Sequence, residues 1–245
     1  MEFRLLETGK NRAAVNMAID EAIMLGRTPT LRFYSWQPPA VSIGYFQGIE
    51  QEVDLAVCKK LGVDVVRRLT GGGAVYHDKE LTYSFIVPEN SGLVSRNILE
   101  SYGQICGFVV DGLRRIGLRA EFKPINDIVV NNKKISGNAQ TRRDGMILQH
   151  GTILLDVDVK TMFSLLKVPD EKMRDKMITA AEERVTSVKK ESGSAGFKEV
   201  RDALVMAFEK RFGVLKSSGL SKEEMRDTHK LFKERYSKRE WNFMR

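Results

Sequence analysis

A glycine-rich segment flanked by charged residues is the first part of the sequence whose residue types suit chemistry. Gly71 to Gly73 are three consecutive glycines, with Arg67-Arg68 shortly before them and His77-Asp78 shortly after. Glycines leave backbone N–H groups open to an anion, and arginine forms paired hydrogen bonds with phosphate or carboxylate. No Lys-Ser/Thr pair follows the glycines, which excludes a P-loop, and the dinucleotide-binding spacing is absent. We interpret the segment as an anion-binding loop rather than a flexible hairpin tip.

A lysine pair near the middle of the chain is the second such segment. Lys133-Lys134 follows Asn126-Asp127 and precedes the small residues of the run ISGNAQ. A lysine beside small residues can reach into a pocket walled by backbone, where its ammonium group neutralises a carboxylate and a phosphate together. The same pattern also fits a surface lysine of a hairpin, so both interpretations stay open on these residues alone.

Hydrophobic patterns indicate the elements that position these segments. Apolar, β-branched and aromatic runs at 31–36, 40–46 and 62–69 predict strands. The run 80–88 alternates, which places Leu81, Tyr83, Phe85 and Val87 on one face of a further strand. Helical spacing of apolar residues predicts a helix over Ile98–Ile116.

Turn residues then predict hairpins, and toward the C-terminus helical patterns replace the strand patterns. Asn131-Asn132 and Asp144-Gly145 separate three strand-like runs, and helical patterns predominate from about residue 197. The fold class is therefore α+β: a mixed sheet of six or seven strands with helices on one side. We expect one principal domain over residues 1–245.

Composition excludes several classes of protein. The 245 residues are 42% hydrophobic and 29% charged, with no apolar stretch of membrane-spanning length and no signal-peptide pattern. Two cysteines form neither a disulfide framework nor a four-ligand zinc site. The net charge of +8 invites an anionic partner, although basic residues are interspersed with acidic ones. We expect a cytoplasmic protein without membrane or nucleic-acid partners.

Taken together, the two chemical segments resemble a known family. RRLTGGGAVYHD followed by NDIVV and KKISGNAQ is similar to the paired signature of lipoate–protein ligases, in the biotin/lipoate ligase superfamily. The intervening ELTYSFIVP, the upstream VSIGYFQ and the downstream LQHGTILLD also fit. The resemblance covers nearly the whole chain and is sharpest over 31–156. It implies a class II biotin/lipoate ligase-like catalytic domain with mixed β-sheets flanked by helices.

The resemblance implies a two-step acyl transfer that uses ATP and Mg²⁺. Lipoate would be activated to lipoyl-AMP and then transferred to a lysine of apo-lipoyl domains, in 2-oxoacid dehydrogenase complexes or the glycine-cleavage H protein. Lys134 would be the catalytic cation between the lipoyl carboxyl group and the α-phosphate. Nucleotide contacts are implied for Arg68, Gly73, Ala74, Val75, Tyr76, Asp127 and Lys134. Lipoate contacts are implied for Gly72, His77, Lys134, Gly137 and Ala139, and Mg²⁺ is expected near Asp127.

Two other functions remain open. A related branch transfers octanoyl groups from acyl carrier protein through a cysteine thioester, and KELTYSFIV and AQTRRDGMILQHGTILLD look close to it. That branch needs a reactive cysteine in the loop before Asn126, whereas Cys58 and Cys106 lie at core-like helix positions. We therefore favour the ligase. A non-enzymatic nucleic-acid or lipoate-binding module would use the basic charge but lacks a nucleic-acid motif.

An accessory unit is a further expectation from the resemblance. Longer family members carry an additional C-terminal domain, and no such domain follows the helical segment in these 245 residues. Either a separate small accessory protein supplies it or the enzyme works without it.

Overall fold

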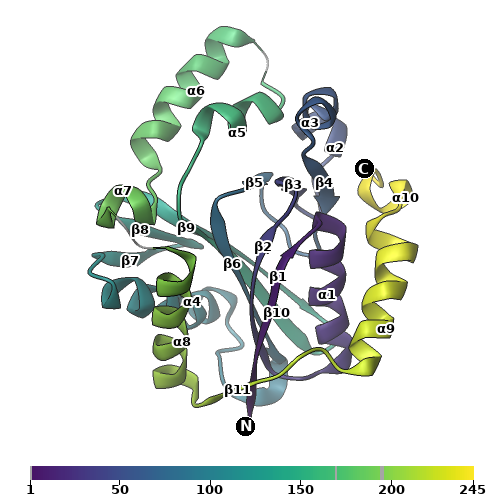
Figure 1. The fold of residues 1–245 in the computed structure, drawn as a ribbon, viewed down its shortest axis with the longest axis vertical. Coiled ribbons are helices and arrows are strands. Elements are labelled where there is room, and N and C mark those ends of the chain that lie inside the picture. Colours follow the sequence, from purple (N-terminus) through teal and green to yellow (C-terminus); the bar gives the residue numbers. More distant parts are fainter. Residues whose placement is uncertain (1, 169, 194–195) are drawn as a thin grey trace.

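A large mixed sheet forms the centre of the computed structural model, which describes residues 2–168, 170–193 and 196–245 (Figure 1). Its strand order is β11-β1-β2-β6-β10-β9-β8-β7. β1 pairs in parallel with both β2 and β11, and the other pairs of this sheet are antiparallel. The strands are β1 (Phe3–Asn11), β2 (Thr30–Trp36), β6 (Glu80–Pro88), β7 (Ala120–Lys123), β8 (Asp127–Val130), β9 (Lys133–Arg143), β10 (Met146–Leu154) and β11 (Leu215–Ser217).

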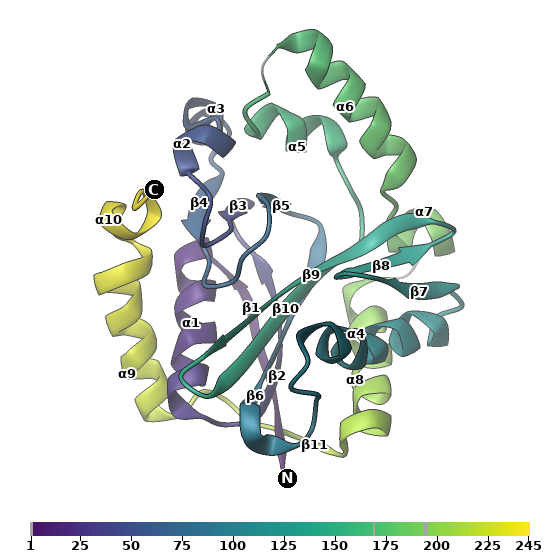
Figure 2. The same cartoon turned by 180° about the vertical axis from the view of Figure 1, so that it is seen from behind.

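A second, three-stranded sheet stands beside one end of the large one (Figure 2). β3 (Ala40–Ile43) lies between β4 (Asp64–Arg67), which is parallel to it, and β5 (Val75–His77), which is antiparallel. Its apolar residues pack with those of two short helices, α2 (Ile49–Glu52) and α3 (Leu55–Leu61), and with Leu165 of α5 (Val159–Leu165).

Alternation along the central strands produces two cores. Odd-numbered residues such as Phe33 and Phe85 pack with α4 (Ile98–Arg115) and α8 (Phe197–Phe212). Their neighbours Tyr34 and Ile86 pack with α1 (Ala13–Gly26) on the other face, because successive side chains of a strand point to opposite faces. β2 and β6 are accordingly buried along almost their whole length. Helices therefore cover both faces of an eight-stranded sheet, and the expectation of six or seven strands with helices on one side is wrong.

The predicted hairpins and helices are largely confirmed. Asn131 and Asn132 have φ of 50° and 61°, and Asp144 and Gly145 have φ of 53° and 70°. Positive φ at both central residues is what two-residue hairpin turns between twisted strands require. α4 covers the predicted helix, with Ile105, Val109 and Leu113 buried, but Ile98, expected on the buried stripe, is exposed on its first turn.

The C-terminal segment crosses from one face of the sheet to the other. After α8 it adds β11 beside β1 and continues into α9 (Lys222–Leu231), a π-helical turn (Phe232–Tyr236) and α10 (Arg239–Asn242), which lie near α1 (Figure 1). The remaining helices are α6 (Glu171–Arg184), α7 (Val188–Ser192) and a 3₁₀ turn at Glu89–Ser91. No helix in the described part of the chain is long and apolar enough to cross a membrane.

Candidate functional site

A cleft of about 380 Å³ lies where the large sheet meets the small one. Its lining comes from β2, β3, β5, β6, β9 and β10, from the glycine loop 71–74, and from the α5 segment and Val185. Concave sites of this size commonly hold small molecules and cofactors. The cleft joins the two chemical segments, because the glycine loop forms one wall and β9 forms another.

The structure brings the predicted contact residues together in this cleft, with one exception. The residues that line it are Arg68, Gly72, Gly73, Ala74, Val75, Tyr76, His77, Lys134, Gly137 and Ala139. Asp127 is absent from the lining but contacts Lys134. Their roles toward a ligand stay predictions.

Lys134 is positioned by an irregularity in β9. Lys134 pairs with Val129 and Ser136 pairs with Ile128, so Ile135 is the extra residue of a bulge. The Lys134 Nζ atom lies 2.7 Å from Oδ1 of Asp127. A Cβ at Gly137 would lie 2.9 Å from the Lys134 Cε atom and 3.0 Å from its Nζ atom, so the glycine makes room for the side chain. Lys133, by contrast, is exposed and does not line the cleft.

The glycine loop is held by close backbone contacts. A Cβ on Gly44 would lie 2.0 Å from the carbonyl oxygen of Gly72, so only glycine fits at position 44. Gly72 itself has a φ of +94°. Among the described residues, the backbone N–H groups of Gly72, Gly73 and Ala74 have no hydrogen-bond partner. The loop therefore offers free donors to an anion, as the sequence predicts.

Arg68 supports the loop from below. Its buried guanidinium group donates five hydrogen bonds, two of them at 2.8 Å to the carbonyl oxygens of Gly71 and Gly73. The others reach Ser42 and Thr70. Burial lowers the pKa of Arg68 to about 10. The expected contact of this side chain with the nucleotide stays a prediction; in the structure its donors are engaged within the protein, where they hold the loop.

A polar cluster forms the wall of the cleft next to His77. The Nδ1 atom of His77 lies 2.7 Å from Oε1 of Glu80, and its Nε2 atom lies 2.7 Å from the Ser42 hydroxyl oxygen. The ring stacks on Trp36 with centroids 4.0 Å apart, and the Trp36 indole N–H donates to the same Glu80 oxygen at 3.0 Å. His77 thus lines the cleft as expected, within a hydrogen-bonded group that the sequence did not reveal.

His150 adds a second imidazole to the lining. Its Nε2 atom lies 2.7 Å from the Thr70 hydroxyl, and its Nδ1 atom lies 3.5 Å from an oxygen of Asp20. Burial lowers the pKa of His150, although Asp20 opposes this effect, so the ring is neutral at neutral pH. His150 connects the glycine loop to the buried Asp20–Arg32 pair.

Neither cysteine belongs to the cleft. Cys58 on α3 is packed in the core of the small sheet, and Cys106 on α4 is packed in the core beneath the large sheet. Burial raises the pKa of Cys58 to about 11 and that of Cys106 to about 12. Both are therefore thiols rather than nucleophilic thiolates at neutral pH, as their helix positions predict.

The described residues contain no group of three His, Cys, Asp or Glu side chains that could hold a metal ion. The expected Mg²⁺ ligand, Asp127, is already paired with Lys134. These residues do not fit a resident metal centre, which leaves the nucleotide phosphates as the place where Mg²⁺ would be held.

Several cleft residues carry no motif that would identify them in sequence. Trp36, Ser42 and Glu80 come from strands that read simply as apolar or alternating, and Met162 and Val185 come from the α5–α6 region. Of these residues, Ser42 alone stands out in the sequence, because it is a polar residue within the apolar run at 40–46.

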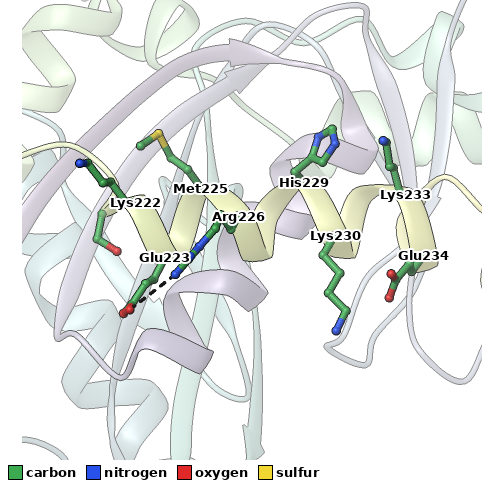
Figure 3. A pocket seen from close by; sticks show the side chains of 9 residues that line it. Lys222, Glu223, Met225, Arg226, His229, Lys230, Lys233 and Glu234 are labelled. Atoms are coloured by element: carbon green, nitrogen blue, oxygen red, sulfur yellow. Dashed lines mark ion pairs between the residues drawn. The ribbon is translucent and has the colours of Figure 1, made fainter.

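A second, open groove lies along α9, far along the chain from these motifs (Figure 3). Its walls come from one surface helix and the turn after it, with basic side chains such as Arg226 and Lys230. An ion pair of 3.6 Å joins Arg226 to Glu223. None of the predicted contact residues lies there, so the cleft is the candidate site.

Known proteins similar to this chain fall into two functional groups. Curated relatives include the octanoyltransferases LipM of Kyrpidia tusciae, 38% identical over 98% of each chain, and of Geobacillus kaustophilus, 37% identical over 99% of this chain and 98% of that one. The names of these relatives favour the octanoyltransferase alternative over the ligase.

Solved structures point toward the ligases. A bi-partite lipoate protein ligase from Thermoplasma acidophilum, studied with its E2 lipoyl domain, superposes with a TM-score of 0.92 at 36% identity over 99% of this chain and 96% of that one. An ATP-bound lipoate-protein ligase A gives a TM-score of 0.86 at 33% identity over 99% of both chains.

The sequence and the fold of this chain both place it in one family. The model of the lipoyl protein ligase A/B catalytic domain matches residues 12–209, and the α+β fold with a large mixed sheet flanked by helices matches the ligase structures. The chain is an enzyme of the lipoyl protein ligase A/B catalytic domain family, within the biotin/lipoate ligase superfamily.

Proposed function

We propose that this enzyme is a lipoate–protein ligase that activates the carboxyl group of lipoate with ATP and transfers the lipoyl group to a lysine of a lipoyl domain. The positions of Cys58 and Cys106 outside the cleft carry this proposal. Transfer through a cysteine thioester needs a thiolate next to the substrate, and these are the two cysteines of the sequence.

The cleft suits the first chemical step. Joining a carboxylate to an α-phosphate brings two anions together, and cations or N–H groups must offset their repulsion. Lys134 supplies a mobile ammonium group, and the glycine loop supplies unpartnered backbone N–H groups. In this role Lys134 exchanges Asp127 for the substrate anions, while Arg68 keeps the loop in shape.

The second step needs little from the protein. AMP is a good leaving group, so the incoming lysine amine requires mainly proximity to the acyl carbon. The lipoyl domain named with the Thermoplasma ligase supports a lipoyl domain as the acceptor class.

Octanoyl transfer is the second candidate function. It is supported by the names of the curated relatives, which are similar to this chain over almost its full length. In this chain such a transfer would have to proceed without a cysteine.

One experiment separates the two functions. The purified protein is incubated with lipoate, ATP and Mg²⁺, and pyrophosphate exchange is measured; parallel samples receive lipoyl-AMP or an octanoyl thioester, each with an apo-lipoyl domain. We expect the lipoyl domain to gain a lipoyl group in the sample that contains lipoyl-AMP. In the sample that contains ATP and lipoate, we expect the same product wherever pyrophosphate exchange shows that lipoate is activated. Modification from the thioester alone would favour octanoyl transfer.

We further propose that a separate accessory protein assists activation. The Thermoplasma ligase similar to this chain is described as bi-partite, and this chain covers 96% of the one chain of it that matches. Slow pyrophosphate exchange combined with efficient transfer from lipoyl-AMP would support this dependence, whereas efficient exchange by the chain alone would exclude it.

A further inference from the structure

Three side chains in the wall of the cleft have a nucleophile–base–acid arrangement that adenylation does not use. The Ser42 hydroxyl is 2.7 Å from Nε2 of His77, and Nδ1 of the same ring is 2.7 Å from Oε1 of Glu80. Both distances fall in the range that joins an activated serine to its base and that base to the group orienting it. All three residues line the cleft.

Glu80 fixes the tautomer of the imidazole. Its Oε1 atom also accepts hydrogen bonds from the Trp36 indole at 3.0 Å and the Thr82 hydroxyl at 2.7 Å. Because the Trp36 and Thr82 protons already point at Oε1, the arrangement that completes this network places the ring proton of His77 on Nδ1. The other nitrogen, Nε2, is then free to accept the proton of Ser42.

The Trp36 ring limits the motion of the imidazole. It stacks on His77 with a centroid separation of 4.0 Å and an interplanar angle of 16°. A base held by stacking on one side and by a carboxylate on the other is preorganised toward Ser42, which removes part of the entropic cost of proton transfer.

Donors for a developing oxyanion lie beside Ser42. The Arg68 Nη1 atom donates to the Ser42 Oγ atom at 3.1 Å, so it holds the hydroxyl group in place and is not itself a donor to the acyl oxygen. The neighbouring loop contributes backbone N–H groups at Gly72, Gly73 and Ala74 that have no partner among the described residues. Ser42 is also almost completely shielded from bulk water, and this limits hydrolysis of a reactive ester.

We propose that Ser42 is a nucleophile that takes an acyl group from an acyl thioester, with His77 as its general base and Glu80 as the residue that orients His77. The Oγ atom attacks the acyl carbonyl carbon, and His77 accepts the hydroxyl proton. The C–S bond breaks, and His77 returns the proton to the departing thiolate, so the products are an acyl-serine ester and a free thiol.

The ester is then resolved by an amine. A lysine amine attacks the ester carbonyl, the C–O bond to Ser42 breaks, and the proton from the amine returns to the serine oxygen through His77. The products are an acyl-lysine amide and free Ser42. This route gives a chain with no cysteine in its cleft the thioester chemistry that its relatives named octanoyltransferases would need. It relies on the proposed function only for the lysine acceptor and takes its octanoyl group from the second candidate function.

The test is detection of the ester without ATP. The protein is incubated with the octanoyl thioester of N-acetylcysteamine, its intact mass is followed, and the modified residue is located by peptide sequencing. We expect an octanoyl adduct on the peptide containing Ser42, stable to neutral hydroxylamine and released by alkali, with stoichiometric release of free thiol.

Variants identify the roles. Ser42→Ala should lose the adduct, and His77→Gln should slow its formation by on the order of 10²-fold or more. Ser218→Ala, at an exposed serine next to β11, is the matched control and should label at the wild-type rate. Should Ser42→Ala fail to fold, Ser42→Cys supplies the answer, because its adduct becomes a thioester that neutral hydroxylamine removes.

The outcomes separate this inference from adenylation. An absent adduct, an adduct on another residue, or unchanged labelling of folded Ser42→Ala would overturn the serine route. Pyrophosphate exchange without an adduct would overturn it and leave the ligase proposal standing. An adduct on Ser42 with neither lipoate-dependent exchange nor transfer from lipoyl-AMP would support the serine route and contradict the ligase proposal alone.

Discussion

At the scale of single residues, the distinction between Lys134 and Lys133 gives the sharpest test of the site. Lys134 lines the cleft above Gly137, whereas its neighbour is exposed. Lys134→Ala should lower lipoyl-AMP formation by on the order of 10²–10³, because one cation that offsets developing charge is lost. Lys133→Ala is the matched control and should have almost no effect. Equal losses in pyrophosphate exchange from the two variants would contradict the assignment.

The thiols provide a second residue-scale prediction. With pKa values of about 11 for Cys58 and about 12 for Cys106, both groups stay protonated and buried at neutral pH. We expect neither to react with iodoacetamide in the folded protein. Replacing both by alanine should cost about 1 kcal/mol of unfolding free energy per site, through lost packing. Rapid alkylation of the native protein at pH 7, measured by intact mass, would show that a thiolate is accessible.

At the scale of elements, a close backbone contact joins the glycine loop to Gly44, the residue that follows β3. Gly44→Ala would place a methyl group 2.0 Å from the Gly72 carbonyl oxygen, and backbone cannot yield as a flexible side chain does. We expect the loop to shift, with nucleotide affinity falling at least tenfold in a calorimetric titration with lipoyl-AMP. Gly219→Ala, where a Cβ would meet no atom within 4 Å, is the control. Normal binding by Gly44→Ala would show that the loop shape is not needed.

The sequence predicted local geometry better than it predicted the layers. Asn131-Asn132 and Asp144-Gly145 carry their turn conformation in their residue types, so both hairpins were predictable. The apolar residues on both faces of β2 and β6 are typical of strands that are buried on both sides. Which helices cover the second face is not visible in the local pattern, because α1 and α9 lie far apart in sequence. β11 has only three residues, and its pairing with β1 depends on tertiary contact.

The candidate site was predictable only where its residues follow one another in the sequence, as in the glycine loop and the segment around Lys134. The glycine loop and Lys134 lie in segments with a composition of their own. The Ser42–His77–Glu80 cluster was not predictable, because it depends on the pairing of β3 with β5, which places residues from separate runs on one wall. The engagement of Arg68 by the loop carbonyls likewise follows from tertiary geometry rather than from its place beside the glycines.

At the scale of the whole molecule, a buried ion pair fastens the C-terminal helix to the sheet. Glu224 belongs to the capping box that Ser221 begins, and it also accepts two hydrogen bonds from Arg4 of β1 at 2.6 and 2.7 Å. Burial alone would raise the pKa of Glu224, but the hydrogen bonds from Arg4 and the Ser221 backbone outweigh it and hold that pKa below its ordinary value of 4.5.

This pair gives the stability a pH dependence of defined sign. Because the pKa of Glu224 is lower in the folded state, its contribution is present above pH 4.5 and is lost as the pH falls through the folded-state pKa. Glu224→Gln should lower the unfolding free energy by about 1–3 kcal/mol at neutral pH. In urea denaturation, the difference in unfolding free energy between the wild-type protein and Glu224→Gln should become smaller below pH 4.5. A difference that stays constant into acid would mean that the carboxylate charge contributes nothing.

Transfer of the acyl group without a cysteine is the claim on which the function depends most. The decisive measurement is the intact mass of an apo-lipoyl domain after incubation with lipoyl-AMP and the Cys58→Ala, Cys106→Ala double variant, confirmed as folded by its thermal unfolding. Because both thiols are packed in the cores and absent from the cleft, we predict that the domain gains one lipoyl group at a rate comparable to that with the wild-type enzyme. An unmodified domain with the folded double variant, beside a modified domain with the wild-type enzyme, would contradict the account.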